Sequence, residues 1–152
     1  LIHYCLKHFR HLLISTGTST YNEMRSTLVS IPQDRFTLLH CVSSYPCSFD
    51  IVNLPRMGSL KNLSHSVGFS DHTQGIEASV LSLVYGVDYI EKHFTIDNDL
   101  PGRDNKFAIL PDKMKRLSEY IKISDKVMNF KGVDYQNCEL DSRKNYTGRF
   151  NG

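Results

Sequence analysis

Cysteine is scarce in this sequence of 152 residues, and long apolar stretches do not occur in it. The four cysteines show neither CxxC spacing nor the density of a disulfide-stabilised domain, so we expect reduced thiols and a cytoplasmic protein. No apolar stretch approaches the roughly 18 residues of a membrane-spanning helix, and we expect no membrane association. Histidines and a lysine interrupt the apolar residues of positions 1–11, which is unlike a secretion signal.

A strong charge of one sign is also lacking. The formal net charge is +2, and the Lys and Arg residues are scattered along the chain rather than clustered. Surfaces that bind nucleic acid are typically strongly basic, so we expect no nucleic-acid partner. The sequences GxGxxG and GxxxxGK followed by Ser or Thr are missing, which argues against the common nucleotide-binding motifs. With 40% hydrophobic residues, the composition is that of one ordinary globular domain.

Short apolar runs alternate with segments of helical spacing over the first 130 residues. Strands are expected at 12–16, 36–42, 67–70 and 89–94, and helices at 20–31, 50–63, 74–85 and from 111 onward. Thr20 and Glu23 have the spacing of a capping box, Gly86 is suited to follow a helix, and Pro111 is suited to open one. Residues 131–152 are polar with little periodicity, and we expect them to form a linker.

Strands that alternate with helices, without hairpin signals between them, predict a parallel α/β sheet. Two architectures fit, a doubly wound open sheet and part of a (β/α)8 TIM barrel. Polar residues follow the carboxyl end of all four strands, which favours the barrel because barrel enzymes gather functional groups there. A complete barrel needs about 250 residues, so we expect residues 1–130 to form half of one, within a larger enzyme.

Two histidines, His72 and His93, each close a predicted strand, and one strand–helix–strand unit separates them. If the strands are parallel neighbours they lie roughly 5 Å apart, and the two imidazoles can share one metal ion. Two protein ligands leave coordination positions open, which suits a catalytic site with Mn²⁺ or Mg²⁺, although imidazole also binds Zn²⁺, Fe²⁺ or Co²⁺. Asp71 or Glu91 is expected to orient the imidazoles, with an ion pair to Lys92 or Arg103 as the structural alternative for Glu91.

Small hydroxyl side chains lie at the same strand ends and are suited to bind phosphate or carboxylate oxygens. They are Ser15, Thr16, Ser43 and Ser70, each of which is also a common turn or cap residue when taken singly. The sequence PGRD at 101–104 offers a carboxylate, Asp104, to sugar hydroxyls, with a solvated turn as the alternative.

Five blocks of sequence, in the same order, resemble the sialic acid synthase family of N-acetylneuraminate, legionaminate and pseudaminate synthases. The blocks are LLISTG (12–17), LLHCVSSYP (38–46), VGFSDHT (67–73), IEKHFT (90–95) and PGRD (101–104). The resemblance covers nearly all of residues 12–128 and implies a TIM barrel in which the predicted strands are strands five to eight. Residues 141–150 resemble the linker that leads to a C-terminal antifreeze-like domain in that family.

The resemblance also implies a reaction and the residues that perform it. The reaction is condensation of phosphoenolpyruvate with an N-acetylated amino sugar, such as N-acetylmannosamine, to a nine-carbon 2-keto acid with release of phosphate. The full-length enzyme is expected to be a domain-swapped homodimer. The implied metal ligands are His72 and His93, with Mn²⁺ or Mg²⁺ bound and the catalytic Glu91 beside them. The implied contacts to phosphoenolpyruvate are Ser15 and Ser70, and those to the sugar are Ser43, Tyr45 and Asp104.

Two other interpretations remain open at this point. The chain could be a non-catalytic remnant that binds a metal or only associates through its exposed strand edges. It could also belong to another phosphate-binding barrel enzyme, such as an aldolase, which would need a Schiff-base lysine at a strand end. Lys92 is the candidate, but we expect it to point away from the barrel interior because the side chains of a strand alternate between its faces.

Overall fold

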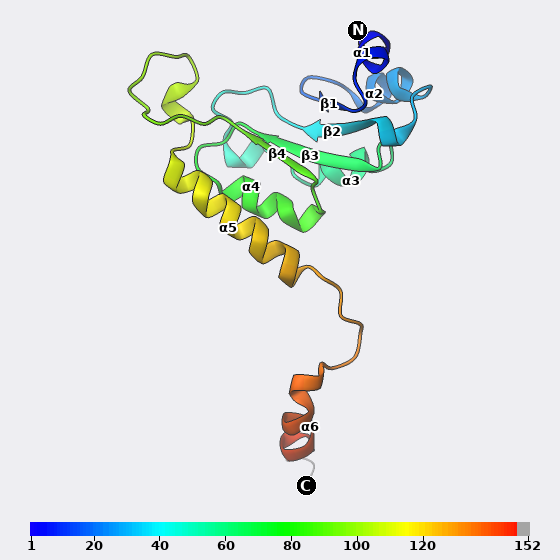
Figure 1. Cartoon of the computed structure of the whole chain (residues 1–152), viewed down its shortest axis with the longest axis vertical. Helices are drawn as coiled ribbons and strands as arrows, with labels where there is room; N and C mark the ends of the chain where they lie inside the picture. The colour runs from blue at the N-terminus through cyan, green and yellow to red at the C-terminus, as the bar shows by residue number, and fades with distance from the viewer. Residues whose placement is uncertain (149–152) are drawn as a thin grey trace.

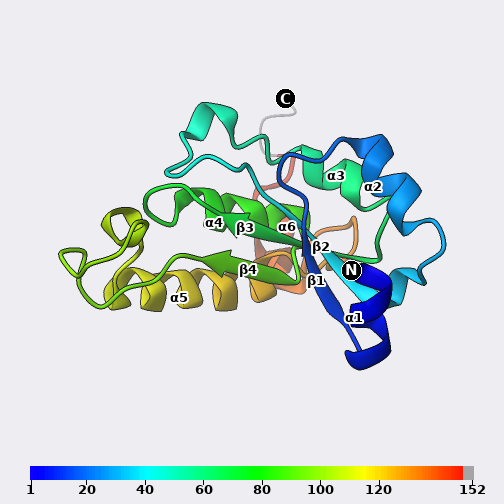
Figure 2. The ribbon, with the colours of Figure 1, turned by 90° about the horizontal axis from the view of Figure 1, so that it is seen from above.

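The computed structural model describes residues 1–148 and contains one parallel sheet of four strands. The strands are β1 (Leu12–Ser15), β2 (Phe36–His40), β3 (Ser66–Asp71) and β4 (Tyr89–Lys92), and their order in the sheet follows the chain. The sheet is curled, with helices on its outer side (Figures 1 and 2). This arrangement confirms the predicted half barrel and excludes an open sheet in which the strand order reverses.

The helices fill the intervals between the strands. They are α1 (Ile2–His8), α2 (Tyr21–Leu28), α3 (Arg56–Leu60), α4 (Glu77–Ser82) and α5 (Pro111–Val127). Apolar residues of α2 and α3 pack against outward side chains of the strands in one core cluster, which includes Met24, Leu28, Leu60, Leu38 and Val67. This burial fixes the outer face of the sheet, because shifting a strand by one residue would send its apolar residues to the opposite face.

The strand register defines the concave face. Leu39 of β2 is in register with Ser15 on one side and with Gly68 on the other, and Gly68 is in register with Tyr89. A Cβ atom at Gly68 would lie 2.4 Å from Leu39 Cδ2 and 2.8 Å from the Tyr89 carbonyl oxygen. Only glycine therefore allows this close approach inside the curl.

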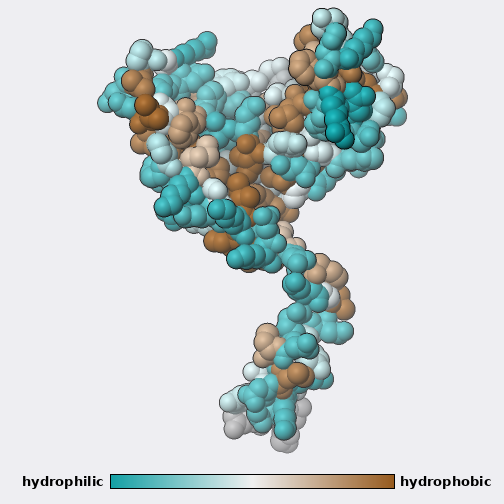
Figure 3. All heavy atoms as spheres, in the orientation of Figure 1, coloured by the Kyte–Doolittle hydropathy of each residue, from teal (hydrophilic) through white to brown (hydrophobic). Residues whose placement is uncertain are grey.

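Apolar side chains on the two edge strands are exposed on this concave face. Leu13 of β1 is 50% exposed and Tyr89 of β4 is 45% exposed. Hydrophobic atoms gather in the middle of the face that carries β4 (Figure 3). A closed barrel buries side chains at these inward positions, so the exposure fits half of a barrel.

A row of hydrogen bonds crosses the sheet at the amino ends of its strands. His11 Nε2 lies 2.8 Å from Thr37 Oγ1, which lies 2.7 Å from Ser66 Oγ. Ser66 donates its hydroxyl proton to Asp88 Oδ2 at 2.7 Å. We call these four residues the amino-end row, and they link all four strands from just before β1 to just before β4.

The local signals in the sequence are confirmed. The Thr20 side chain accepts the Glu23 amide while the Glu23 carboxylate accepts the Thr20 amide, which forms the expected capping box. Gly86 follows the 3-10 helix η3 (Leu83–Tyr85) with φ of 61°, a left-handed conformation that glycine adopts without strain. Pro111 is the first residue of α5.

Two elements have boundaries that differ from those expected. The segment expected as a helix at 50–63 is divided into the 3-10 helix η2 (Phe49–Ile51) and α3, which begins after Pro55. A proline ring tolerates only the first turn of a helix, which accounts for this late start. Beyond β4, Phe94 pairs with Ile109 instead of extending the sheet, because the chain returns on itself.

The expected linker contains a helix that its sequence pattern did not reveal. The 3-10 helix η5 (Asn137–Glu139) leads into α6 (Leu140–Tyr146), which lies away from the sheet (Figure 1). Its start is stabilised locally, because the Glu139 carboxylate accepts the Gln136 amide at 2.6 Å. Residues 149–152 of the expected linker lie outside the described residues, and the division at residue 130 stays a prediction.

Within residues 1–148, every helix is too short or too polar to cross a lipid bilayer.

Candidate functional site

The two strand-end histidines lie side by side at the carboxyl end of the sheet. Asp71 of β3 is in register with Lys92 of β4, and the next residues along these strands are His72 and His93. Their ring centroids are 5.5 Å apart, with an angle of 63° between the ring planes. A metal ion bound at about 2.1 Å from a nitrogen of each ring fits this separation. The two imidazoles therefore lie close enough to share an ion, and the binding of that ion stays a prediction.

His72 is held in one orientation by the loop that follows β2. Its Nδ1 lies 2.8 Å from the backbone carbonyl oxygen of Val42, which can only accept, so Nδ1 carries the proton. In the neutral ring this leaves a lone pair on Nε2, which is the nitrogen that faces the concave side near Ser70. A carbonyl partner of this kind commonly orients a metal-binding histidine. The donor chemistry of His72 therefore fits a divalent metal.

Ser70 connects His72 to Glu91. The Ser70 hydroxyl lies 3.2 Å from His72 Nε2 and donates its proton to Glu91 Oε1 at 2.6 Å. Because the Ser70 proton points to Glu91 and His72 Nε2 carries none, no hydrogen bond links Ser70 to the imidazole, and the orienting role expected for Glu91 stays a prediction. We call Ser70, His72, Glu91 and His93 the carboxyl-end cluster.

His93 has fewer partners than His72. Within residues 1–148, no protein group forms a hydrogen bond with its ring nitrogens, and the Phe107 ring lies edge-on to it at a centroid distance of 5.0 Å. No group of three or more His, Cys, Asp and Glu side chains in this part of the chain is arranged to hold a metal ion. The protein thus offers two imidazoles, and other positions around a bound ion would be open to water and substrate.

Tyr45 and Ser43 reach the same end of the sheet from the loop after β2. The Tyr45 ring lies 4.2 Å from the His72 ring and 6.0 Å from the His93 ring, measured between centroids. The Ser43 hydroxyl packs directly on Gly17, where an added Cβ atom would come within 2.3 Å of Ser43 Oγ. Both side chains therefore line the mouth of the half barrel together with the carboxyl-end cluster.

The remaining predicted binding residues lie farther out. Ser15 is exposed at the end of β1, with β2 and β3 between it and β4. Asp104 precedes the 3-10 helix η4 (Asn105–Phe107), so its loop reaches the site through the contact of Phe107 with His93. Thr16 is not available as an anion ligand, because its buried hydroxyl donates to the Leu39 carbonyl at 2.9 Å.

Asp71 does not orient an imidazole ring, although it was one of the two residues, with Glu91, expected to do so. It points to the outer face, where its carboxylate forms an ion pair of 3.1 Å with Lys92. Lys92 points away from the barrel interior, as the alternation of strand side chains predicts. This position removes the support for a Schiff-base aldolase, and it also removes Lys92 as a partner for Glu91. Burial lowers the pKa of Lys92, while the neighbouring Asp71 carboxylate raises it in part.

Three features of the site carried no signal in the sequence. They are the Val42 carbonyl that orients His72, the Phe107 ring against His93, and the guanidinium of Arg56. Arg56 donates to the carbonyl oxygens of Thr16 at 3.3 Å and Ser19 at 2.8 Å, and so holds the loop after β1. Arg56 is 37 to 40 residues from these partners, so no local pattern could have indicated the contacts.

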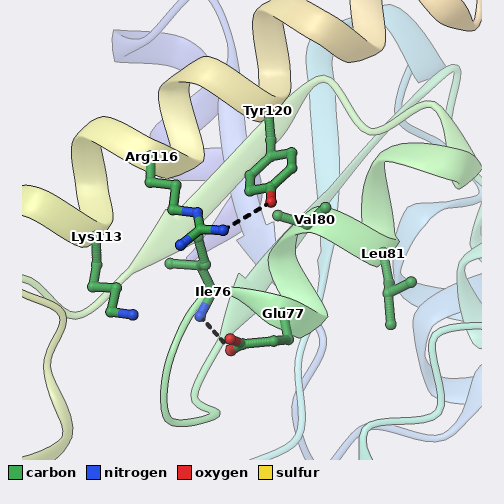
Figure 4. A pocket seen from close by; sticks show the side chains of 7 residues that line it. All are labelled: Ile76, Glu77, Val80, Leu81, Lys113, Arg116 and Tyr120. Atoms are coloured by element: carbon green, nitrogen blue, oxygen red, sulfur yellow. Dashed lines mark hydrogen bonds between the residues drawn. The ribbon is translucent and has the colours of Figure 1, made fainter.

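A separate hollow of about 380 Å³ lies between α4 and α5 (Figure 4). Apolar side chains of α4 form one wall, and Lys113, Arg116 and Tyr120 of α5 form the other. Its polar groups are partly occupied by local bonds, since Arg116 donates to Tyr120 Oη at 3.3 Å and the Glu77 carboxylate accepts the Ile76 amide at 2.8 Å. The hollow is on the helical side of the sheet, and neither histidine of the carboxyl-end cluster lines it.

Comparisons with known proteins agree with the fold of this chain. The profile of the NeuB family matches residues 1–132. The chain is 37% identical over 125 residues to N,N'-diacetyllegionaminic acid synthase of Campylobacter jejuni, covering 78% of this chain and 37% of that protein. It is 36% identical over 135 residues to the protein of the same name from Legionella pneumophila, covering 84% and 38%. The chain therefore spans little more than a third of the length of these relatives.

Solved structures show the same relationship. N-acetylneuraminic acid (sialic acid) synthetase from Leptospira borgpetersenii aligns with a TM-score of 0.77 and 29% identity, over 90% of this chain and 50% of that one. The spore coat polysaccharide biosynthesis protein spsE from Bacillus subtilis aligns with a TM-score of 0.75 and 30% identity, over 84% and 37%. The expected resemblance to sialic acid synthases is thus confirmed for the greater part of the chain.

Proposed function

This chain belongs to the NeuB family, and we infer that it supplies the carboxyl-terminal half of the barrel of a sialic acid synthase-type enzyme. The proposed reaction joins phosphoenolpyruvate to the open-chain aldehyde of an N-acetylated amino sugar, such as N-acetylmannosamine. The products are a nine-carbon 2-keto sugar acid and inorganic phosphate. The observation that supports it most is the pair of imidazoles, His72 and His93, at 5.5 Å on neighbouring strand ends.

The proposed cofactor is a divalent metal, Mn²⁺ or Mg²⁺, held by His72 and His93. When bound, such an ion acts as a Lewis acid that polarises the sugar aldehyde. The lone pair on His72 Nε2 is available because Nδ1 donates to the Val42 carbonyl oxygen. The His93 ring is held edge-on by Phe107 and keeps its nitrogens free of other protein partners within the described residues 1–148.

The reaction needs one new carbon–carbon bond and one broken carbon–oxygen bond. C3 of phosphoenolpyruvate attacks the aldehyde carbon, and positive charge develops at C2. The aldehyde oxygen takes up a proton and becomes a hydroxyl group, while a water molecule adds at C2 and loses a proton. The C2–O bond to phosphate then breaks, phosphate leaves with the electron pair, and the remaining C2 hydroxyl loses its proton to give the 2-keto group. Glu91, which accepts a hydrogen bond from the Ser70 hydroxyl, is proposed to take up a proton from a group at the mouth of the site.

The substrate contacts are proposed from the same positions. Ser15 and Ser70 are proposed to donate to phosphoenolpyruvate oxygens. Ser43, Tyr45 and Asp104 are proposed to line the sugar site, since Tyr45 and Ser43 belong to one loop beside His72. The cytoplasmic location and the domain-swapped homodimer of the complete enzyme stay predictions.

The proposal is tested on the complete protein that contains this chain. The protein is incubated with phosphoenolpyruvate, Mn²⁺ and each of several N-acetylated hexoses, with and without a 6-phosphate, and both 2-keto acid and phosphate are measured. We expect equal amounts of the two products with at least one sugar, and loss of both after treatment with EDTA, with recovery on adding Mn²⁺. Absence of 2-keto acid with every sugar would contradict the proposal and favour a non-catalytic protein.

A further inference from the structure

The ends of β3 and β4 are joined on the outer face by a buried ion pair. Asp71 and Lys92 are register partners, and Lys92 Nζ lies 3.1 Å from Asp71 Oδ2. The two side chains are 0% and 2% exposed. Each of them directly precedes one of the two histidines, so the pair spans the same two strands as the imidazoles but from the opposite side of the sheet.

The pair forms further hydrogen bonds with the groups around it. Asp71 accepts the amide of Thr73 at 2.8 Å on one oxygen, and the Ser79 hydroxyl at 2.5 Å together with Lys92 on the other. Lys92 also donates to the carbonyl oxygen of Thr73. These bonds connect β3, β4, the residue after His72 and the first turns of α4.

The backbone of His72 is consequently fixed on both sides. Asp71 and Thr73 flank it, and its own carbonyl oxygen accepts the Cys47 amide at 2.8 Å. A buried ion pair is seldom a net source of stability, because the cost of desolvating both charges offsets their attraction. For a pair that lies directly behind two imidazoles, a role in geometry is therefore a better account than a role in stability alone.

We infer that Asp71 and Lys92 are positioning residues that hold the His72 and His93 backbones at the separation required for both rings to bind one divalent metal. The inference rests on the proposed function, because it assumes that the two imidazoles share an ion. Neither residue touches the ion or a substrate, since both side chains face the helices. They act on the metal site only by fixing the backbone at the ends of β3 and β4.

The test measures Mn²⁺ affinity directly, by the electron paramagnetic resonance signal of the free ion, on the complete protein that contains this chain. Lys92→Met removes the ammonium group, and the double variant Asp71→Asn/Lys92→Met removes both charges and leaves neither unpaired. We expect both variants to bind Mn²⁺ about 10- to 100-fold more weakly than the wild type, the range found for residues that support metal ligands from behind. The double variant guards against misfolding of the single one, because it buries no unpaired charge.

Ser82→Ala is the matched control. The Ser82 hydroxyl is buried on α4 and donates to the Ser79 carbonyl oxygen at 2.7 Å, without touching the ion pair. We expect this variant to lower the thermal unfolding midpoint while its Mn²⁺ affinity stays at the wild-type value. A purely structural role for the pair predicts the same pattern for the double variant as for Ser82→Ala.

Two results would overturn the inference, and they are distinguishable. Wild-type Mn²⁺ affinity in the folded double variant would refute positioning while leaving the proposed metal site intact. A wild-type protein that binds no Mn²⁺ would refute the proposed metal site itself, and the positioning role with it.

Discussion

At the amino ends of the strands, the amino-end row of His11, Thr37, Ser66 and Asp88 is bonded to itself in a continuous line across the sheet. At the carboxyl ends, the carboxyl-end cluster is bonded only in part. Within residues 1–148, the His93 ring nitrogens lack a protein partner, and His72 Nε2 has only the nearby Ser70 hydroxyl.

We propose that this difference separates structural polar groups from functional ones in the same sheet. Polar groups that satisfy one another are typical of a stabilising network, whereas unsatisfied nitrogens at a strand mouth are available to a ligand. In barrel enzymes the amino-terminal end serves stability and the carboxyl-terminal end carries the chemistry. We expect the half barrel to follow that division, and substitutions at the two ends of the strands test it.

The largest effect is expected for His93→Ala in the carboxyl-end cluster. Loss of a metal ligand is expected to reduce turnover of the complete enzyme by more than about 1,000-fold, which corresponds to about 4 kcal/mol. The free energy of unfolding should change little, because the ring has no hydrogen bond to lose in the described residues. Steady-state kinetics and urea denaturation measure the two quantities.

His11→Ala in the amino-end row is the matched control for this histidine. It should leave turnover unchanged and lower the free energy of unfolding by about 1 kcal/mol, because it removes the bond to Thr37. Equal loss of turnover in both variants would break the proposed division between the two ends.

Gly68→Ala lies between the two ends and is expected to destabilise the sheet. The added methyl group would overlap Leu39 Cδ2 at 2.4 Å and the Tyr89 carbonyl oxygen at 2.8 Å. Overpacking of this kind typically costs about 1–3 kcal/mol, which urea denaturation would detect. Gly58→Ala is the control, because nothing lies within 4 Å of its added Cβ atom on α3, and it should stabilise the helix slightly.

Thr37→Val breaks the amino-end row while keeping the size of the side chain. The buried hydroxyl bridges His11 and Ser66, so its loss should lower the free energy of unfolding by about 1–2 kcal/mol and leave turnover unchanged. Thr37→Ser keeps the hydroxyl and should lose less. A decrease in turnover for the valine variant at a temperature where it remains folded would argue that the two ends are coupled.

The smallest effect concerns His40, a strand-end histidine that lies outside the carboxyl-end cluster. Burial lowers the pKa of His40, although its bond of 2.7 Å to the Val52 carbonyl opposes this. The unfolded chain therefore takes up a proton more readily than the folded one. Stability from this residue is complete above about pH 6.5 and is lost as the pH falls toward the lowered value.

The variant His40→Gln sharpens this prediction. Its unfolding free energy, measured by urea denaturation between pH 7.5 and 5, should fall less steeply than that of the wild type. Parallel pH profiles for the two proteins would show that His40 is not the group responsible.

Much of the fold could be predicted from the sequence because the relevant signals are local. Apolar runs and helical spacing gave all four strands and the helices between them, with Gly86 and Pro111 at the expected boundaries. Alternation along the strands placed Lys92 on the outer face. The same alternation, applied to Asp71, would have placed it beside Lys92 rather than beside the imidazoles.

The sequence by itself determined the parallel α/β class, the two strand-end histidines and the family, because each depends on residue order and short-range spacing. Only the tertiary structure decided which side chains meet. The amino-end row, the Val42 carbonyl behind His72 and the hold of Arg56 on the loop after β1 all join residues more than 20 positions apart. Such contacts depend on the register and curl of the sheet. A single hydrogen bond between distant residues produces no periodic pattern in the sequence around either residue, so it cannot be predicted from local spacing.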